Sequence, residues 1–139
     1  MNDPIRTDQA PPPVGAYPHA RRVGDLLFLS GVGPRRPDGS GIPGNTHDAD
    51  GNLVAYDIGA QCRQVFANVR AVLEASGARW EDLVDVTVFL TDMARDFDAY
   101  NKVYAEYFDG VDACRTTLGI DALPTPIAIE LKCIAAPKR

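Results

Sequence analysis

The clearest hydrophobic pattern in the chain lies between residues 58 and 76. Apolar side chains recur there at positions 58, 62, 65, 66, 69, 72 and 73. This spacing of three and four residues places them on one face of an α-helix, and Gly77 follows as a residue type that commonly ends helices. The pattern therefore predicts an amphipathic helix over residues 58–76 with one buried face.

A second helical pattern, which begins after position 92, is carried mainly by aromatic residues. Asp92 is of the type that caps helix N-termini, because its carboxylate can accept a hydrogen bond from a free backbone amide. We expect the aromatic side chains to pack in the core rather than to stack on a ligand. The polar residue Asn101 belongs to the same series and is assigned neither to the core nor to a site. The series is Phe97, Tyr100, Asn101, Tyr104, Tyr107 and Phe108.

Three further stretches alternate between apolar and polar positions or are rich in Thr, Ile and Leu, as strands are. They cover residues 85–91, 115–120 and 127–135, and a Pro-containing turn at 123–126 separates the last two. In the last stretch, period-2 alternation leaves Glu130 on the face opposite Ile129 and Leu131. An acid inside such a strand is either part of a solvated outer face beside Lys132 or part of a site.

The first 55 residues carry weaker signals. Residues 1–13 are polar and end in three prolines, so we expect an extended, partly ordered arm. Apolar residues at 14–17 and 26–30, with a turn signal at Gly24-Asp25, predict a hairpin or small meander. Residues 34–55 contain several prolines and glycines, so we expect a long loop there, and loops of this length are often functional.

These elements predict an α+β domain in which two helices cover one face of a sheet of about six strands. The other face is expected to carry Phe89, Ile134 and Ala128 among Thr87, Thr117 and Glu130. Such a surface is too apolar for bulk water. We therefore expect further copies of the chain to cover it.

Composition narrows the classes of protein. A chain of 139 residues fits one domain, and 45% hydrophobic with 24% charged residues is typical of a globular protein. The net charge of -5 and the scattered cations argue against nucleic acid as a partner. Three widely separated cysteines and two separate histidines predict no metal site. The chain has no signal peptide and no apolar run of about 18 residues, which indicates a cytoplasmic protein without membrane contact.

Candidate chemistry begins with Arg115 and Glu130, one on each of the two C-terminal strands. A guanidinium grips a carboxylate through two parallel hydrogen bonds. A nearby carboxylate can hold and polarise a water molecule. Together the two side chains could anchor and hydrolyse a small acid without a cofactor.

The same stretch resembles the C-terminal signature of the RidA/YjgF reactive-intermediate deaminases. Further blocks of the chain, in the same order as in that family, extend the resemblance over nearly all of it except residues 34–55. The blocks are VGAYPHA at 14–20, LSG at 29–31, QCRQVFANV at 61–69, YNKVYAEYF at 100–108, CRTTLG at 114–119, LP at 123–124 and IAIEL at 127–131.

The resemblance implies a chorismate-mutase-like single domain whose three copies close their sheets into a barrel, with sites between neighbours. It implies hydrolysis of an anionic enamine or imine, with Arg115 as the carboxylate anchor and Glu130 as the group that binds the attacking water. It also implies that Tyr17 and Ser30 line the pocket and that Asn101 is a further polar contact. Many relatives carry cysteine where this chain has Thr117, so a cysteine nucleophile is not required, and the backbone at Thr117 would help to hold the water.

Within the family the chain is similar to the 2-aminomuconate deaminases, in the length of the 34–55 loop and in the segments GVGPR at 31–35 and LPTPIAIEL at 123–131. This likeness implies hydrolysis of 2-aminomuconate to 4-oxalocrotonate and ammonia in the breakdown of aromatic compounds. The second carboxylate of that substrate needs its own cation. We expect Arg35 or Arg36 to supply it, with His47 as a third candidate.

Two other functions remain open. One is a general deaminase of 2-imino acids such as 2-iminopropanoate, which would use the same Arg115 and Glu130. The other is a trimer without enzymatic activity that binds metabolites in the same clefts or protects other proteins. Measuring the turnover of 2-aminomuconate and of 2-iminopropanoate would distinguish these functions.

Overall fold

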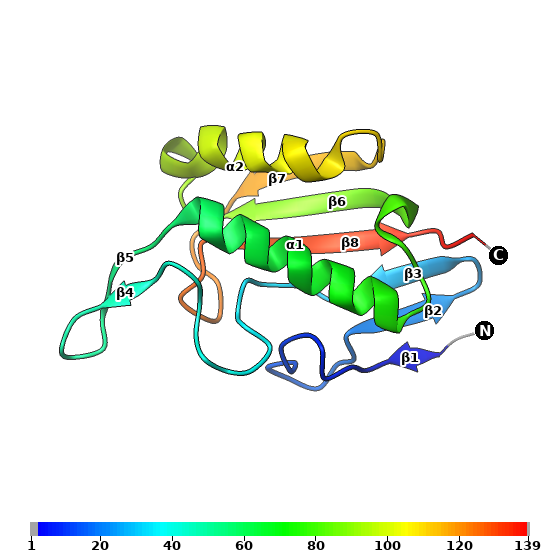
Figure 1. Ribbon diagram of the computed structural model, residues 1–139, viewed down its shortest axis with the longest axis horizontal. Helices are drawn as coiled ribbons and strands as arrows, with labels where there is room; N and C mark the ends of the chain where they lie inside the picture. The colour runs from blue at the N-terminus through cyan, green and yellow to red at the C-terminus, as the bar shows by residue number, and fades with distance from the viewer. Residues whose placement is uncertain (1–2, 139) are drawn as a thin grey trace.

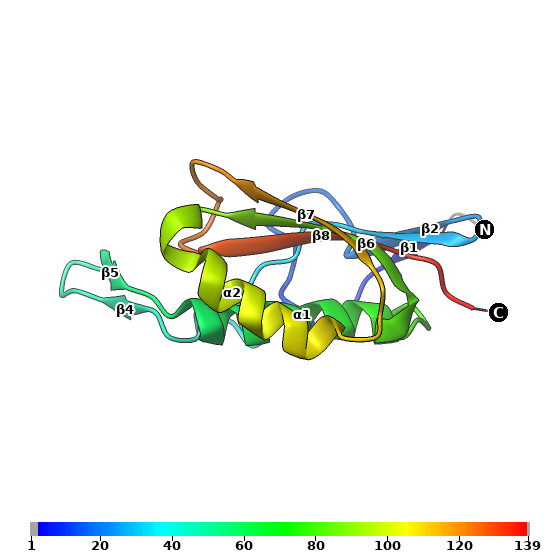
Figure 2. The ribbon, with the colours of Figure 1, turned by 90° about the horizontal axis from the view of Figure 1, so that it is seen from above.

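Residues 3–138 are described in a computed structural model, in which two helices pack against one face of a six-stranded sheet (Figures 1 and 2). The α+β prediction is therefore confirmed. The first two residues of the expected N-terminal arm lie outside the described residues. The elements are β1 (Pro4–Ile5), β2 (Ala20–Val23), β3 (Leu26–Leu29), β4 (Thr46–His47), β5 (Leu53–Ala55), α1 (Ile58–Ala75), the short helix η1 (Trp80–Asp82), β6 (Leu83–Leu90), α2 (Met93–Phe108), β7 (Cys114–Gly119) and β8 (Ile129–Ala135).

The main sheet has the strand order β1-β2-β3-β8-β6-β7. All neighbours are antiparallel except β6 and β7, which run parallel and are joined through α2. A parallel pair needs a crossover connection of this length, and the helix in it must lie on one face of the sheet. The sheet is therefore mixed, and β7 forms its edge.

Helix α1 matches the predicted span of 58–76 to within one residue. The Asp57 carboxylate accepts a hydrogen bond from the Ala60 amide at 3.0 Å, which caps the N-terminus. Ser76 is the C-cap, and Gly77 follows with φ of 75°, a left-handed conformation that costs glycine little. Val65 and Phe66 are fully buried beneath the helix.

Helix α2 begins where the sequence indicates. The Asp92 carboxylate accepts a hydrogen bond from the Arg95 amide at 3.0 Å. Tyr100, Tyr104 and Phe108 are 0%, 9% and 7% exposed, so the prediction that they belong to the core is confirmed. Asn101, by contrast, is exposed.

The two faces of the sheet differ sharply. Val86, Val88 and Leu90 of β6 are fully buried under the helices, whereas Thr87 and Phe89 face away and are half-buried. Figure 2 shows both helices on one side of the sheet and none on the other. We call the second side the open face.

Two residues predicted for the open face lie elsewhere. Thr117 is paired in register with the buried Val88, and its hydroxyl lies 2.9 Å from the Tyr100 hydroxyl on α2, so it faces the helices. Ala128 precedes β8 and is 2% exposed. Alternation of residue types did not predict the face of either residue, because pairing with neighbouring strands decides which face a side chain occupies.

The N-terminal prediction was wrong in two respects. Residues 14–17 form no strand; the hairpin pairs β2 with β3 around the Gly24-Asp25 turn. The arm is also packed rather than loose: β1 pairs with β2, and Ala10 is 2% exposed. His19 ties the arm down, since its ring accepts a hydrogen bond from the Thr7 amide at 3.3 Å and its Nε2 lies 2.9 Å from the Pro11 carbonyl.

The segment 34–55 is not wholly a loop. Its second half forms the two-stranded sheet β4–β5, which projects from the body of the molecule (Figure 1). The sequence did not predict β4 and β5, because strands of two or three residues are too short to show an alternation of apolar and polar positions. The first half, residues 34–45, is irregular and lies against the body beside α1.

Candidate functional site

Glu130 lies on the open face of β8, at the side of a small hollow. Burial raises the pKa of its carboxyl above the usual range. Gly31 sits directly against it, because a Cβ at that position would lie 2.9 Å from Glu130 Oε2. The hollow is lined by Val14, Tyr17, Gly31, Gly33, Arg35, Pro124, Thr125, Ile127 and Glu130.

The segment that forms one wall of this hollow is bonded to β8. Val32 and Leu131 exchange two backbone hydrogen bonds, of 2.8 and 2.9 Å. Val32 is 8% exposed, so the segment is anchored by apolar packing as well. The short irregular stretch after β3 therefore has a fixed position relative to Glu130.

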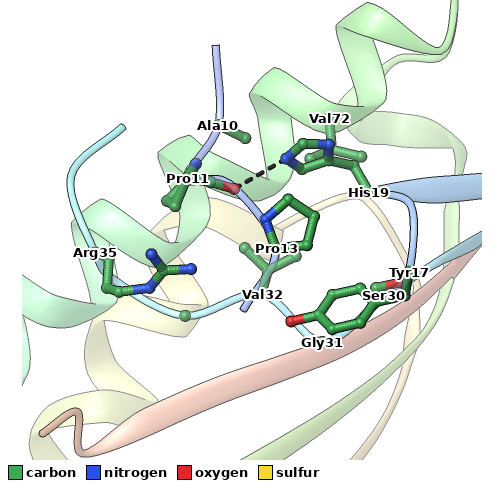
Figure 3. Close-up of a pocket in the computed structure, with 11 residues that line it drawn as sticks. Ala10, Pro11, Pro13, Tyr17, His19, Ser30, Gly31, Val32, Arg35 and Val72 are labelled. Atoms are coloured by element: carbon green, nitrogen blue, oxygen red, sulfur yellow. Dashed lines mark hydrogen bonds between the residues drawn. The ribbon is translucent and has the colours of Figure 1, made fainter. Parts of the chain in front are cut away.

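Three of the predicted site residues, Tyr17, Ser30 and Arg35, line a neighbouring hollow that includes His19 (Figure 3), and Tyr17 and Arg35 also line the hollow of Glu130. The Tyr17 hydroxyl accepts a hydrogen bond from the Val14 amide at 3.1 Å. The Ser30 hydroxyl donates to the Pro18 carbonyl at 2.7 Å. In Figure 3 the guanidinium of Arg35 and the hydroxyl of Tyr17 point toward one another across this hollow.

Arg115, Asn101 and Thr117 form a second group, at the edge of the sheet where β7 meets α2. Arg115 Nη1 donates to Asn101 Oδ1 at 2.8 Å. Its guanidinium lies 4.7 Å from the ring centre of Tyr104 and 5.4 Å from that of Tyr100. The side chain is exposed but oriented by these contacts.

A single chain does not bring Arg115 and Glu130 together. Arg115 is paired in register with Val86, whose side chain is on the helix-covered face, whereas Glu130 is paired with Phe89 on the open face. Strand β6 separates the two residues in the sheet. The chain therefore presents two half-sites, one with Arg115, Asn101 and Thr117, and one with Glu130 and its neighbours.

Arg36 and His47 lie apart from Glu130. They line a wider cavity under the 34–45 segment, to which Arg35, Thr125 and Pro126 also contribute. Arg36 Nη1 donates to the Ser40 carbonyl at 3.3 Å. Of the three cationic candidates for the loop, Arg35 alone reaches the hollow of Glu130.

Three amide side chains of α1 that hold the walls of these hollows were not among the residues predicted from sequence. Gln61 and Asn68 are 0% and 1% exposed, and Gln64 is half-buried. Positions 61 and 68 are next to apolar positions of the helix and are seven residues apart, which puts them on one face. Two amide residues on the apolar side of a helix are the sequence signal from which buried, hydrogen-bonded side chains could have been predicted.

Residues 3–138 contain no group of three or more His, Cys, Asp or Glu side chains that could hold a metal ion. Over the same residues, no helix is long and apolar enough to cross a bilayer.

The fold and the half-sites define a small α+β protein with hollows along its sheet, and comparison with known proteins identifies the family. The family model described as Endoribonuclease L-PSP matches residues 7–137. The chain therefore belongs to this family, which also contains the RutC and RidA proteins. A RutC family protein of Pyrococcus horikoshii is 38% identical over 135 residues, covering 97% of this chain and 98% of that protein.

Two further relatives add a name and a structure. Reactive Intermediate Deaminase A of Arabidopsis thaliana is 35% identical over 131 residues, which are 94% of this chain and 64% of that protein. The crystal structure of yeast YEO7 superposes with a TM-score of 0.85 at 33% identity, covering 99% of this chain and all of that one. The similarity to RidA structures predicted from sequence is thus confirmed.

Proposed function

We propose that the protein is a deaminase that hydrolyses the imine or enamine forms of small 2-oxo acids. The observation that carries this proposal is Glu130, a half-buried carboxylate with a raised pKa and no cationic partner among the described residues, at the side of a small hollow. A relative named Reactive Intermediate Deaminase A supports the same reaction class.

In the proposed reaction a water molecule adds to the imine carbon and Glu130 accepts its proton. A carbon–oxygen bond forms while the electrons of the C=N bond move to nitrogen, which takes the proton held by Glu130 and returns Glu130 to its carboxylate form. Glu130 then accepts the hydroxyl proton of the resulting carbinolamine and passes it to the amine, so that the carbon–nitrogen bond breaks, ammonia leaves and the carbonyl forms. Arg115 holds the substrate carboxylate so that the imine carbon faces the water.

We further propose that each site is shared between copies of the chain, in a homotrimer. The separation of Arg115 from Glu130 by a strand and by the two faces of the sheet supports this arrangement. A bidentate guanidinium and a water-binding carboxylate act on one small molecule only if both reach it. A second copy whose β7 edge meets the open face would bring its Arg115 group to Glu130.

The general 2-imino acid deaminase is better supported than the 2-aminomuconate deaminase. The names of the relatives include a reactive-intermediate deaminase and RutC proteins, and none of those cited refers to 2-aminomuconate. Hydrolysis of 2-aminomuconate is the narrower hypothesis.

The test supplies the purified protein with 2-iminopropanoate, generated in the cuvette from alanine by an amino-acid oxidase, and with freshly made 2-aminomuconate. We expect faster ammonia release from the first substrate than in the protein-free reaction. The Glu130→Gln variant is the matched control, because it keeps the shape of the side chain without its charge. Spontaneous rates with both substrates would refute the deaminase, and cleavage of RNA in a parallel assay would favour the activity in the family's description.

A further inference from the structure

Strand β7 is the edge of the main sheet, and one of its residues is drawn into the interior of the protein. The strand pairs with β6 alone among the described strands. Thr117 is half-buried, whereas the other residues of the strand are exposed. An edge strand has backbone partners on one side only. The side-chain contacts that Thr117 makes toward the helices therefore weigh heavily in fixing the position of β7.

The hydroxyl of Thr117 is hydrogen bonded to a tyrosine of α2. Its oxygen lies 2.9 Å from the hydroxyl oxygen of Tyr100, which is fully buried. Burial raises the pKa of Tyr100, so its hydroxyl is protonated at neutral pH and can donate this bond. A buried hydroxyl that loses its partner is costly. The pair therefore constrains how closely α2 and β7 approach one another.

Arg115 lies on the same face of β7 as Thr117, two residues before it. Its Nη1 donates to Oδ1 of Asn101, the residue that follows Tyr100 on α2. Two side-chain hydrogen bonds thus join neighbouring positions of the helix to neighbouring positions on one face of the strand. The bond of Arg115 is exposed to water, whereas the bond of Thr117 is shielded. We therefore infer that the shielded bond is the firmer of the two.

Tyr100 also supplies part of the aromatic surface on which Arg115 rests. The guanidinium lies 5.4 Å from the ring centre of Tyr100 and 4.7 Å from that of Tyr104, within the range of a cation–π attraction. The two rings pack edge to face with centres 5.9 Å apart, and Tyr104 stacks on Phe108 at 4.0 Å. Tyr100 therefore contacts Thr117 through its hydroxyl and Arg115 through its ring.

We propose that the hydrogen bond between Tyr100 and Thr117 positions the guanidinium of Arg115, and that these two residues thereby set how tightly the protein holds a substrate carboxylate. This inference rests on the proposed deaminase function and adds two positioning residues to that site. A bidentate grip is strongest when the plane and direction of the guanidinium are fixed before the ligand arrives. Tyr100 and Thr117 act through Arg115, so neither has to touch the substrate.

The experiment measures the binding of 2-oxopropanoate, the carboxylate that hydrolysis of 2-iminopropanoate would release, by calorimetric titration. Tyr100→Phe keeps the ring and removes the hydroxyl, so we expect it to raise the Kd by about 3- to 10-fold, as the loss of one hydrogen bond does. Thr117→Val should raise the Kd by the same factor. Thr117→Ser keeps a hydroxyl and should bind to within about twofold of wild type.

A variant that carries both Tyr100→Phe and Thr117→Val shows whether the two hydroxyls act as one unit. Because each single variant already breaks the same bond, we expect the double variant to bind no more weakly than the weaker single variant. The matched control is Tyr107→Phe, the same substitution on the same helix at a ring that lies 5.9 Å from the guanidinium of Arg63. We expect it to change the Kd by less than about twofold.

The titration also separates a positioning role from damage to the fold. Loss of folding lowers the number of binding sites per chain, whereas a displaced Arg115 raises the Kd at an unchanged number of sites. The inference is overturned if Tyr100→Phe leaves the Kd unchanged, with or without a loss of sites, or if the losses of the single variants add in the double variant. It is also overturned if wild type does not bind 2-oxopropanoate.

Failure of this inference can be told apart from failure of the deaminase proposal, because the titration needs no turnover. A protein that binds 2-oxopropanoate but hydrolyses no imine would refute the deaminase, and the Kd values would still decide the role of Tyr100 and Thr117. A protein that hydrolyses 2-iminopropanoate with the same Kd in wild type and Tyr100→Phe would refute the positioning role alone.

Discussion

At the scale of single residues, the surroundings of Glu130 bear on the two interpretations that its sequence position allowed. A solvated outer face would pair it with Lys132, but the Lys132 ammonium donates to the Leu29 carbonyl instead. No ion pair between the two side chains is present in the described part of the chain. Both side chains are half-buried, and this burial raises the pKa of Glu130 and lowers that of Lys132.

The raised pKa of Glu130 predicts a shifted pH dependence of activity. The carboxylate must be ionised to accept the proton of the attacking water, so kcat/KM should rise with pH through the pKa of Glu130. Because burial raises that pKa, the acid limb should lie at higher pH than an ordinary glutamate would give. A pH–rate profile of the wild-type protein tests this, and an acid limb at the usual glutamate pKa would contradict it.

Replacing Arg115 with lysine should be far from conservative. Arg115 both donates to Asn101 and lies over the rings of Tyr104 and Tyr100, contacts that orient a planar fork. We expect Arg115→Lys to lose about 2 to 4 kcal/mol of transition-state binding, or roughly 30- to 1000-fold in kcat/KM. Steady-state kinetics on 2-iminopropanoate measures it, with circular dichroism as the check that the fold is kept. An unchanged kcat/KM would remove Arg115 from the site.

At the scale of elements, α1 does more than cover the sheet, because its amide side chains connect segments far apart in sequence. Gln61 Nε2 donates to Asn45 Oδ1 at 2.9 Å, and Gln61 Oε1 accepts from the Ala128 amide at 2.8 Å. Asn45 Nδ2 in turn donates to the Pro126 carbonyl at 2.9 Å. The 34–45 segment and the turn before β8 are thus tied to the same helix, and both line the hollows around Arg35.

Gln61→Leu should therefore destabilise the protein although the new side chain is apolar and of similar size. It leaves the buried amide of Ala128 without its partner, which should cost about 1 to 3 kcal/mol of unfolding free energy. Urea denaturation measures the loss, and amide exchange should become faster at Asn45. The matched control is Glu74→Leu, a similar change on the exposed side of the same helix, and an equal loss in both variants would contradict the role of Gln61.

At the scale of the whole molecule, the open face of the sheet presents apolar side chains that no helix of residues 3–138 covers. Phe89 and Ile134 are half-buried there, and Leu118 on the edge strand is 44% exposed. Covering such a face with further copies would remove apolar surface from water. The same arrangement would join the two half-sites, so assembly and activity should be inseparable.

Mixing two inactive variants tests the shared site directly. Arg115→Ala and Glu130→Gln should each lose activity alone, but co-refolded mixtures should recover about a quarter of the wild-type rate, because random assembly pairs an intact Arg115 with an intact Glu130 in that share of sites. Light scattering should give three times the mass of a chain of 15.0 kDa. A fully active monomer, or no recovery in mixtures that do assemble, would contradict the shared site.

Much of the fold could be predicted because it depends on local periodicity. The helices over 58–75 and 93–108 and the strand β6 follow from patterns that repeat within a few residues. The expected strand at 14–17 was wrong, because a short apolar run does not reveal whether a pairing partner lies beside it. The sequence alone also predicted Arg115, Glu130 and Arg35 as candidate site residues.

The sequence by itself thus determined the two helices, the central strands and the types of residue available for chemistry, since each depends on near neighbours. Only the tertiary structure decided which of those residues can act together. Arg115 and Thr117 face the helices because β7 runs parallel to β6 after a helical crossover, and Glu130 faces the other way because of its register with Phe89. Arg35 joins Glu130, while Arg36 does not, through hydrogen bonds from Asn68 on a distant helix. Strand order, register and such contacts are set by the packing of the whole chain, and no local pattern encodes them.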